Sequence, residues 1–155
     1  MSTPDQRIEQ LGIKLTTKIP KGKGLVSCVQ DGHILYVSGN GPEDDKGNLL
    51  FVGKVGKELT VEEGYQAARQ TGIQLLRSVH DFLGSLNRVE RIIKVLAFVN
   101  STEDFHDQPK VVHGFSDLMV EVFGENGKHA RSAIGTSNLA DNQPIEIEMI
   151  VKIKE

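Results

Sequence analysis

The residues from Ile145 to Ile153 alternate between two kinds of side chain, and no other stretch of the 155-residue chain constrains the fold as strongly. One set is apolar and comprises Ile145, Ile147, Met149, Val151 and Ile153, and the other comprises Glu146, Glu148, Ile150 and Lys152. A period of two residues places the two sets on opposite faces of a β-strand. The stretch therefore predicts a strand with one apolar and one mainly polar face.

A second strand is predicted just before this one. The residues from Arg131 to Thr136 are small or β-branched, and the segment from Asn138 to Pro144 is rich in turn formers. We therefore expect the two strands to lie side by side, with Arg131 and Glu146 near their outer ends. An arginine and a glutamate in this arrangement could recognise a small carboxylate and activate a water molecule beside it. This pair is the predicted working centre.

The rest of the chain contains clear strand and helix patterns. Strands are predicted for Leu25 to Val29, His33 to Ser38, Leu49 to Val52 and Ile92 to Val99, the first two joined by an Asp-Gly turn. Helices are predicted for residues 4 to 12, from the capping box of Thr60 and Glu63 to Gly84, and from Pro109 to Gly124. The run from Ile92 to Val99 is almost unbroken in its apolar character, which indicates a strand covered on both faces.

These elements follow one another in the order β-β-β-α-β-α-β-β, after a short N-terminal helix. The simplest packing places both long helices on one face of a mixed sheet, which gives a two-layer α+β domain. The second face of the sheet then has no cover, although it carries Ile150 and the outer side of the strand from Ile92 to Val99. We therefore expect a homo-oligomer whose open sheet faces are buried against each other, with a small-ligand site between subunits.

Composition narrows the class of protein. The chain has 38% hydrophobic and 25% charged residues, no apolar run long enough to cross a membrane and no apolar signal sequence, so we expect a cytoplasmic protein of one domain. Its formal net charge of -3 argues against a nucleic-acid partner, and Lys18, Lys21 and Lys23 form the only compact basic cluster. The one cysteine, Cys28, follows Val26 closely and is predicted to be a buried hydrophobe.

Neither a metal nor a cofactor is expected. The loop from Ser38 to Asn48 lacks the glycine spacing of a dinucleotide or P-loop fingerprint and is predicted to be a long turn. Asp104, His106, Asp107 and His113 are close in the sequence but match no metal-ligand spacing. Ser38 lacks the flanking residues of a nucleophilic serine, so we expect it to form a hydrogen bond with a ligand and not to act as a nucleophile.

With this order of elements, three motifs resemble the reactive intermediate deaminase family, also called Rid or YjgF. They are Ile34 to Gly39, Val95 to Val99 followed by Asp104 and Phe105, and Ala130-Arg131-Ser132 followed by Ile145 to Glu148. The last is the most specific, because members of the family place an arginine fifteen positions before the first glutamate, as Arg131 and Glu146 do here. The resemblance covers most of residues 25 to 153 and implies a single domain over residues 1–155, with 1–24 as an N-terminal extension and 25–155 as the core.

The resemblance implies the chorismate-mutase-like fold of the bacillus type and a homotrimer with three sites at subunit interfaces. It also implies hydrolysis of reactive enamines and imines to 2-keto acids and ammonia, with no cofactor. Arg131 would bind the substrate carboxylate through two parallel hydrogen bonds, and Glu146 would position or deprotonate the attacking water. The other positions implied to line the substrate site are Leu25, Ser38, Gly39, His113 and Ala133.

Several of these positions depart from the residues that the family usually carries. Leu25 stands where the family has a tyrosine, His113 where it has an asparagine, and Ala133 where it has a cysteine. Asn40-Gly41-Pro42 replaces the usual Gln-Ile-Pro. These changes keep Arg131 but alter the wall of the pocket, so they bear on substrate identity and on catalysis itself.

Three functions from different classes remain open. The first is an imine or enamine hydrolase, and the second is a non-catalytic binder of small carboxylates that uses the same arginine. The third is an endoribonuclease, an activity attributed to some members of the family, and the acidic net charge counts against it. The simpler alternative for Arg131 and Glu146 is a structural ion pair at a subunit contact. For His113 and Glu148 the simpler alternative is a packed or solvated side chain.

Overall fold

The alternating C-terminal strand lies at the centre of a mixed sheet. The computed structural model describes all 155 residues and orders the five strands β1-β2-β5-β3-β4. Their bounds are β1 Cys28–Asp31, β2 Ile34–Asn40, β3 Val89–Asn100, β4 Ala130–Thr136 and β5 Ile145–Ile153. All neighbouring pairs are antiparallel except β3 and β4, which run parallel. The predicted two-layer α+β fold is confirmed.

The first two of the three helices begin with a capping box. The bounds of the helices are α1 Pro4–Gln10, α2 Val61–Leu83 and α3 Gln108–Phe123, with short 3-10 turns η1 Leu86–Arg88, η2 Gly124–Gly127 and η3 Ala140–Asn142. The capping box predicted for α2 is present, because Thr60 Oγ1 accepts from the Glu63 amide at 3.1 Å and Glu63 Oε1 accepts from the Thr60 amide at 3.2 Å. Gly84 ends α2 in the left-handed conformation, at φ 80°. None of the helices has both the length and the apolar character needed to cross a membrane.

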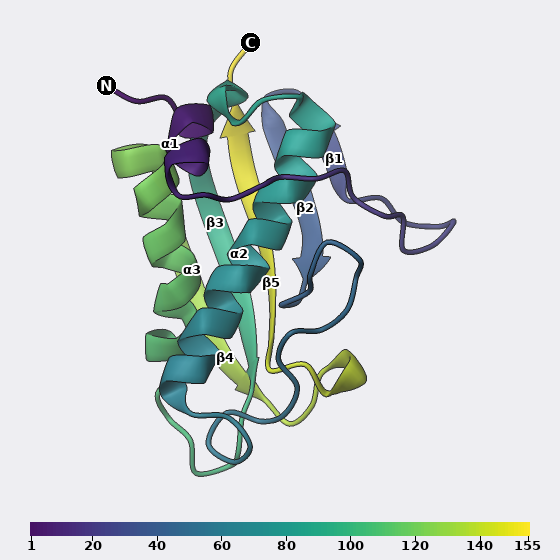
Figure 1. Cartoon of the computed structure of the whole chain (residues 1–155), viewed down its shortest axis with the longest axis vertical. Helices are drawn as coiled ribbons and strands as arrows, with labels where there is room; N and C mark the ends of the chain where they lie inside the picture. Colours follow the sequence, from purple (N-terminus) through teal and green to yellow (C-terminus); the bar gives the residue numbers. More distant parts are fainter.

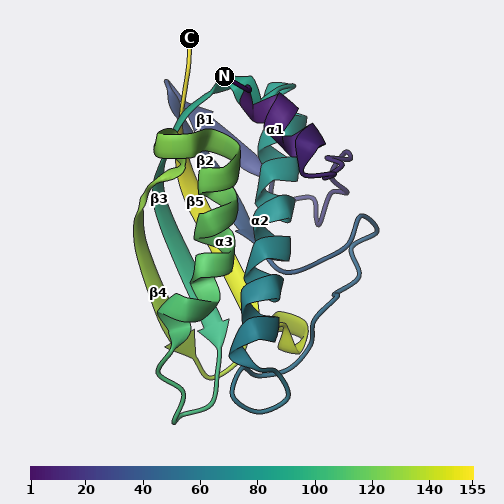
Figure 2. The same ribbon diagram turned by 60° about the vertical axis from the view of Figure 1, so that its left-hand side comes forward.

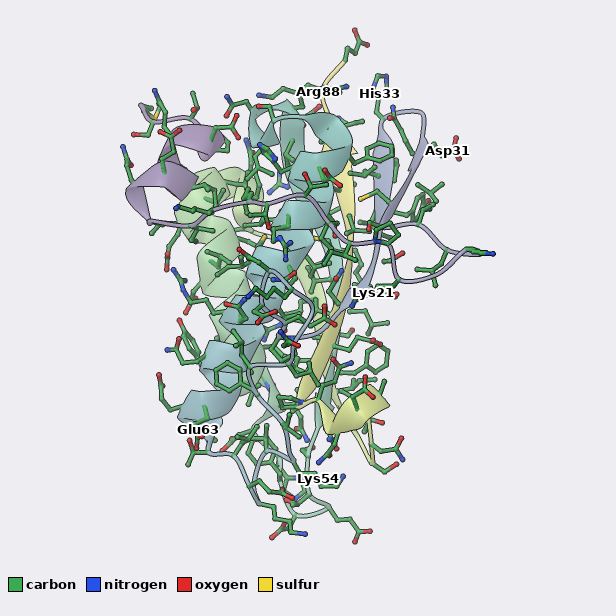
Figure 3. The ribbon with its side chains drawn as sticks, turned by 45° about the vertical axis from the view of Figure 1, so that its right-hand side comes forward. Lys21, Asp31, His33, Lys54, Glu63 and Arg88 are labelled. Carbon is green, nitrogen blue, oxygen red and sulfur yellow. The ribbon has the colours of Figure 1, made fainter.

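Helices α2 and α3 cover one face of the sheet. Figure 1 shows both helices in front of the strands, and Figure 2 shows the sheet behind them with its second face uncovered. The apolar set of β5 points into this interface, where Ile145, Ile147 and Val151 are fully buried. Burying an aliphatic side chain of this size stabilises the fold by about 1.5–3 kcal/mol. The β1–β2 turn, between Asp31 and Ile34, lies at one end of the molecule and the start of α2, at Glu63, lies at the other (Figure 3).

Two predictions about the sheet are wrong. β4 and β5 are not neighbours, because β3 lies between them and is hydrogen-bonded to both. The segment from Leu49 to Val52 is not a third strand, and only Leu49 forms a bridge, to Glu43. Instead, the Leu50 amide donates to the Pro42 carbonyl within a loop. The apolar side chains of this segment were the reason for predicting a strand, but its backbone closes a turn.

The open face of the sheet is apolar for much of its area. Val29, Tyr36 and Ile134 are exposed by 54%, 49% and 45%, and Leu96, Phe98 and Ile150 are half-buried. Val29 and Tyr36 are directly opposite each other in β1 and β2. Contiguous apolar surface of this kind marks a region that another molecule covers. The face that sequence analysis expected to be uncovered is therefore uncovered within one chain.

A buried arginine attaches the N-terminal segment to α2. Arg77 is only 2% exposed, and its Nε and Nη2 donate to the carbonyls of Thr16 and Thr17, each at 3.2 Å. Its Nη1 donates to Gln74 Oε1 at 2.6 Å and to the Asp44 carbonyl at 3.4 Å. One guanidinium thus joins three parts of the chain that are far apart in the sequence.

The contact between α2 and α3 depends on Gly114. A Cβ atom at this position would lie 2.0 Å from the Tyr65 carbonyl oxygen, so the two helix backbones would have to move apart. We expect Gly114→Ala to lower the free energy of unfolding by about 2–3 kcal/mol, measured by urea denaturation. Gly24→Ala is the matched control, because no atom lies within 4 Å of the added carbon and its stability should change by less than about 0.5 kcal/mol. Equal stability of the two variants would contradict this account of the helix packing.

Candidate functional site

Arg131 lies near the start of the edge strand β4, and its side chain contacts α3. It is opposite Val95 in the parallel register with β3, and Val95 is fully buried under the helices, so Arg131 points to the helix-covered side of the sheet. Nη1 donates to Ser116 Oγ at 3.0 Å and to His113 Nδ1 at 3.2 Å, and Nη2 donates to the Pro109 carbonyl at 3.5 Å. All three acceptors are on α3, and none of them is a carboxylate.

The donors of Arg131 are only partly used within the chain. A guanidinium carries five N–H groups, and the three hydrogen bonds leave Nε–H and one Nη2–H without an acceptor. No carboxylate lies within 4.0 Å of the guanidinium, so Arg131 forms no ion pair inside one chain. Burial lowers the pKa of Arg131 and the charge of Asp117 raises it, and the group remains a cation. A charged fork with two adjacent donors therefore remains available.

His129 lies behind this arginine and contacts the same serine. Its Nδ1 is 2.7 Å from the Gly127 carbonyl, and its Nε2 is 3.0 Å from Ser116 Oγ. The ring also packs edge-on against Phe115, with ring centroids 5.8 Å apart. Burial is the main cause that lowers the pKa of His129, and the charge of Arg131 lowers it further. His129 is therefore a neutral, fixed side chain at neutral pH.

Glu146 lies on the opposite face of the sheet. It is paired with Phe98 in β3, on the open face, and it contacts the backbone of β2 at Gly39. A Cβ atom at Gly39 would lie 3.2 Å from the Glu146 carboxyl carbon, so glycine is what lets the carboxylate approach the strand. The β2–β5 register is interrupted between Val37 and Asn40, which re-aims this part of β2. Glu146 has no hydrogen-bond or ion-pair partner within the chain.

The predicted site residues divide into two groups. Arg131 and His113 are in contact, and Ala133 follows on the same face of β4. Glu146, Ser38 and Gly39 form the second group on the open face, where Ser38 Oγ donates to the Val26 carbonyl at 2.7 Å. Leu25 immediately precedes Val26 and is 56% exposed. We refer to these as the arginine group and the glutamate group.

One chain does not bring the two groups together. Arg131 and Glu146 are on opposite faces of the sheet, with β3 between their strands. The expectation that they meet because β4 and β5 are neighbours is therefore wrong. The physical reason is that β3 accepts a strand along each edge, so both strands pair with β3 and not with each other.

Sequence reasoning missed Ser116 and His129. Ser116 is three residues after His113 on a predicted helix, a spacing that puts both side chains on one helix face. His129 is two residues before Arg131, a spacing that puts both on one face of an extended segment. Both signals were present in the sequence, and what was lacking was the knowledge that α3 lies along β4.

Other titratable side chains lie outside the arginine group and the glutamate group. No group of three or more His, Cys, Asp or Glu side chains is gathered in a way that could hold a metal ion. Cys28 is buried as predicted, and burial raises the pKa of its thiol to about 12. Burial and the neighbouring charges of Lys21 and Arg77 lower the pKa of Lys18 to about 8, while its ammonium donates to Asn40 Oδ1 at 2.8 Å.

Comparison with known proteins agrees with the fold and the motifs. The family model described as "YjgF/chorismate_mutase-like, putative endoribonuclease" matches residues 25–147. Protein TCP17 of Trypanosoma cruzi is 40% identical over 147 residues, which cover 94% of this chain and 91% of that protein. A crystal structure of Atu1372 from Agrobacterium tumefaciens has a TM-score of 0.88 and 34% identity, with 97% and 92% of the two chains covered.

A second solved structure is similar over the whole chain. A putative endoribonuclease from Shewanella oneidensis has a TM-score of 0.91 and 27% identity, and the alignment covers 98% of this chain and 100% of that one. The layers, the strand order and the two polar groups define a small α+β domain of the chorismate-mutase-like fold. The chain belongs to the YjgF, or Rid, family, as its motifs indicated.

The neutral state of His129 predicts how stability depends on pH. Its pKa is lowered in the folded protein, so its contribution to stability is complete above the ordinary histidine pKa of 6.5 and is lost as the pH falls toward the folded value. We expect the free energy of unfolding to decrease between about pH 7.5 and pH 5 more in the wild type than in His129→Gln. Urea denaturation at several pH values measures this difference. The same pH dependence in both proteins would show that His129 is not buried as a neutral ring.

Proposed function

We propose that this protein hydrolyses reactive enamines and imines of small 2-amino acids to 2-keto acids and ammonia, at a site formed between two copies of the chain. The observation that carries the proposal is the state of Arg131. It is half-buried, charged and oriented by acceptors that are not carboxylates, and it keeps Nε–H and one Nη2–H free. These two donors match the two oxygens of a carboxylate, which a guanidinium binds through parallel hydrogen bonds.

Glu146 is the proposed acceptor of a proton from water. Water adds to the carbon of the protonated imine and loses one proton to the Glu146 carboxylate, which gives a neutral carbinolamine. The Glu146 carboxyl group returns this proton to the nitrogen. The C–N bond then breaks, the carbinolamine hydroxyl loses its proton to the carboxylate as the keto group forms, and ammonia leaves. Family membership supports this assignment, because the Arg131 and Glu146 positions match the family motif. An imine is already electrophilic, so positioning of the water and the carboxylate accounts for much of the rate.

The geometry supports a site shared between subunits. Arg131 and Glu146 are both without an acidic or basic partner in their own chain, and they lie on opposite faces of the sheet. The open face that carries Glu146 is also the apolar face with Val29 and Tyr36. Burying this face against another copy would bring the edge strand of one chain toward the glutamate group of another. A homotrimer closes such an arrangement by symmetry.

The binding of small carboxylates without turnover is the second candidate. It uses the same two donors of Arg131 and does not need Glu146 as a base. Leu25 favours it, since this exposed apolar residue stands where the family usually supplies a tyrosine hydroxyl. Binding of pyruvate with no acceleration of imine hydrolysis over buffer would select this function. Cleavage of RNA that is lost in Arg131→Ala would select an endoribonuclease instead.

Single substitutions test the two proposed roles. Arg131→Lys should raise KM for a freshly generated imine about tenfold to a hundredfold, because lysine cannot make the bidentate contact. Glu146→Gln should lower kcat about a hundredfold while KM changes little. Arg69→Lys is the control, because Arg69 pairs with Glu121 on the outer surface of the helices. Release of 2-keto acid and ammonia gives the rates, and wild-type kinetics in both test variants would reject the proposal.

Mixed assemblies test whether the site is shared between chains. Assemblies of Arg131→Ala chains alone, or of Glu146→Gln chains alone, are expected to be inactive. A refolded equal mixture of the two should recover about a quarter of the wild-type activity, because an intact Arg131 then meets an intact Glu146 at about one interface in four. Sedimentation should give the mass of three chains rather than the 17.0 kDa of one. A mixture as inactive as its components, or a monomer at micromolar concentration, would exclude a site between subunits.

A further inference from the structure

The hydrogen bonds around Arg131 have a defined direction. The Gly127 carbonyl can only accept, so His129 Nδ1 carries the proton and donates to it at 2.7 Å. His129 Nε2 is then an acceptor, and the Ser116 hydroxyl donates to it at 3.0 Å. This leaves the Ser116 oxygen as an acceptor for Arg131 Nη1, also at 3.0 Å. The Gly127 carbonyl thus determines which group donates and which accepts at His129 and at Ser116.

His129 is held in place on three sides. Gly127 accepts from one ring nitrogen, Ser116 donates to the other, and the Phe115 ring packs edge-on at 5.8 Å with an interplanar angle of 70°. Phe115 is itself fully buried in the core, so the histidine ring is anchored to the rigid part of the molecule. Burial keeps the ring neutral.

We propose that Ser116 and His129 are positioning residues that hold Arg131 in the orientation in which it binds a carboxylate. The proposal rests on the function proposed above and adds residues that the family motif does not include. This role does not require either residue to touch the ligand. The two residues act through Nη1, the nitrogen that does not take part in the side-on contact through Nε and Nη2.

A neutral support suits a cation that must bind an anion. An arginine is often oriented by a carboxylate, but an acidic partner neutralises the guanidinium and competes with the ligand for it. Ser116 and His129 fix the guanidinium without adding negative charge, and no acid lies within 4.0 Å of Arg131. The full positive charge therefore remains for the ligand.

Matched substitutions of Ser116 test its positioning role, with the affinity for pyruvate measured by calorimetry. Ser116→Ala removes the acceptor and should weaken binding about fivefold, the value of one hydrogen bond. Ser116→Thr retains a hydroxyl and should restore most of the affinity. Ser116→Asp should orient Arg131 but weaken binding more than Ser116→Ala, because it supplies the competing charge. His80→Asn, on the last turn of α2, is the control that should bind as the wild type does.

The two polar replacements of His129 separate a specific role from a structural one. His129→Gln can place an oxygen acceptor near the Nε2 position, so it should keep pyruvate binding. His129→Asn can replace only the Nδ1 side of the ring. Because it leaves the Ser116 hydroxyl without its acceptor, it should weaken pyruvate binding. In the proposed reaction these losses should appear as a higher KM with little change in kcat. Ser116→Ala with wild-type affinity, Ser116→Thr as weak as Ser116→Ala, or equal loss in both His129 variants would overturn the proposal.

Nuclear magnetic resonance gives a readout that does not depend on activity. Long-range nitrogen–proton correlation of His129 should show the neutral tautomer with the proton on Nδ1, and the Arg131 Nε–H resonance should shift in Ser116→Ala but not in Ser116→Thr. A proton on Nε2 of His129, or an unchanged Arg131 Nε–H resonance in both Ser116 variants, would overturn the proposed positioning role. If the wild type neither binds pyruvate nor hydrolyses imines while the resonances behave as expected, the proposed function fails and the hydrogen-bonded arrangement of Arg131 stands.

Discussion

The pairing of β3 on both of its edges determines the rest of the structure. β5 runs antiparallel along one edge and β4 runs parallel along the other. A parallel neighbour needs a crossover connection, and α3 supplies it between β3 and β4. The crossover places α3 alongside β4, where Pro109, His113 and Ser116 reach Arg131. The same pairing separates Arg131 from Glu146.

Local features of the sequence predicted most of the elements. Both long helices have apolar stripes that favour a helix, and in α2 the capping residues Thr60, Glu63 and Gly84 act as expected. The alternation of β5 predicted its buried face correctly, since Ile147 is fully buried. The apolar run of β3 was predicted to be covered on both faces, but within one chain only the face with Val95 is buried, while Leu96 on the other face is half-buried. Leu49 to Val52 was misread because composition says which side chains favour a strand, whereas backbone partners decide whether one forms.

The arrangement of the candidate site could not be predicted from the sequence, and the assignment of its residues stays a prediction. The arginine and glutamate were identifiable from their spacing, while their placement on opposite faces depends on strand order, which no local pattern specifies. Ser116 and His129 were missed for a related reason, because their roles depend on α3 lying along β4. The departures at Leu25 and His113 acquire meaning in the structure: Leu25 is exposed beside the glutamate group, and His113 accepts from Arg131.

The hydrogen bonds of the buried Arg77 bear on where the folded domain begins. The family model begins at residue 25, yet two of the carbonyls that Arg77 binds belong to Thr16 and Thr17. In a shortened protein that begins at residue 25, the buried Arg77 guanidinium would lose two of its four hydrogen-bond acceptors. We expect this loss to lower the free energy of unfolding by about 1–3 kcal/mol or more. The stable folded unit is therefore expected to be longer than the segment that the family model matches, because residues before 25 supply acceptors to a buried side chain.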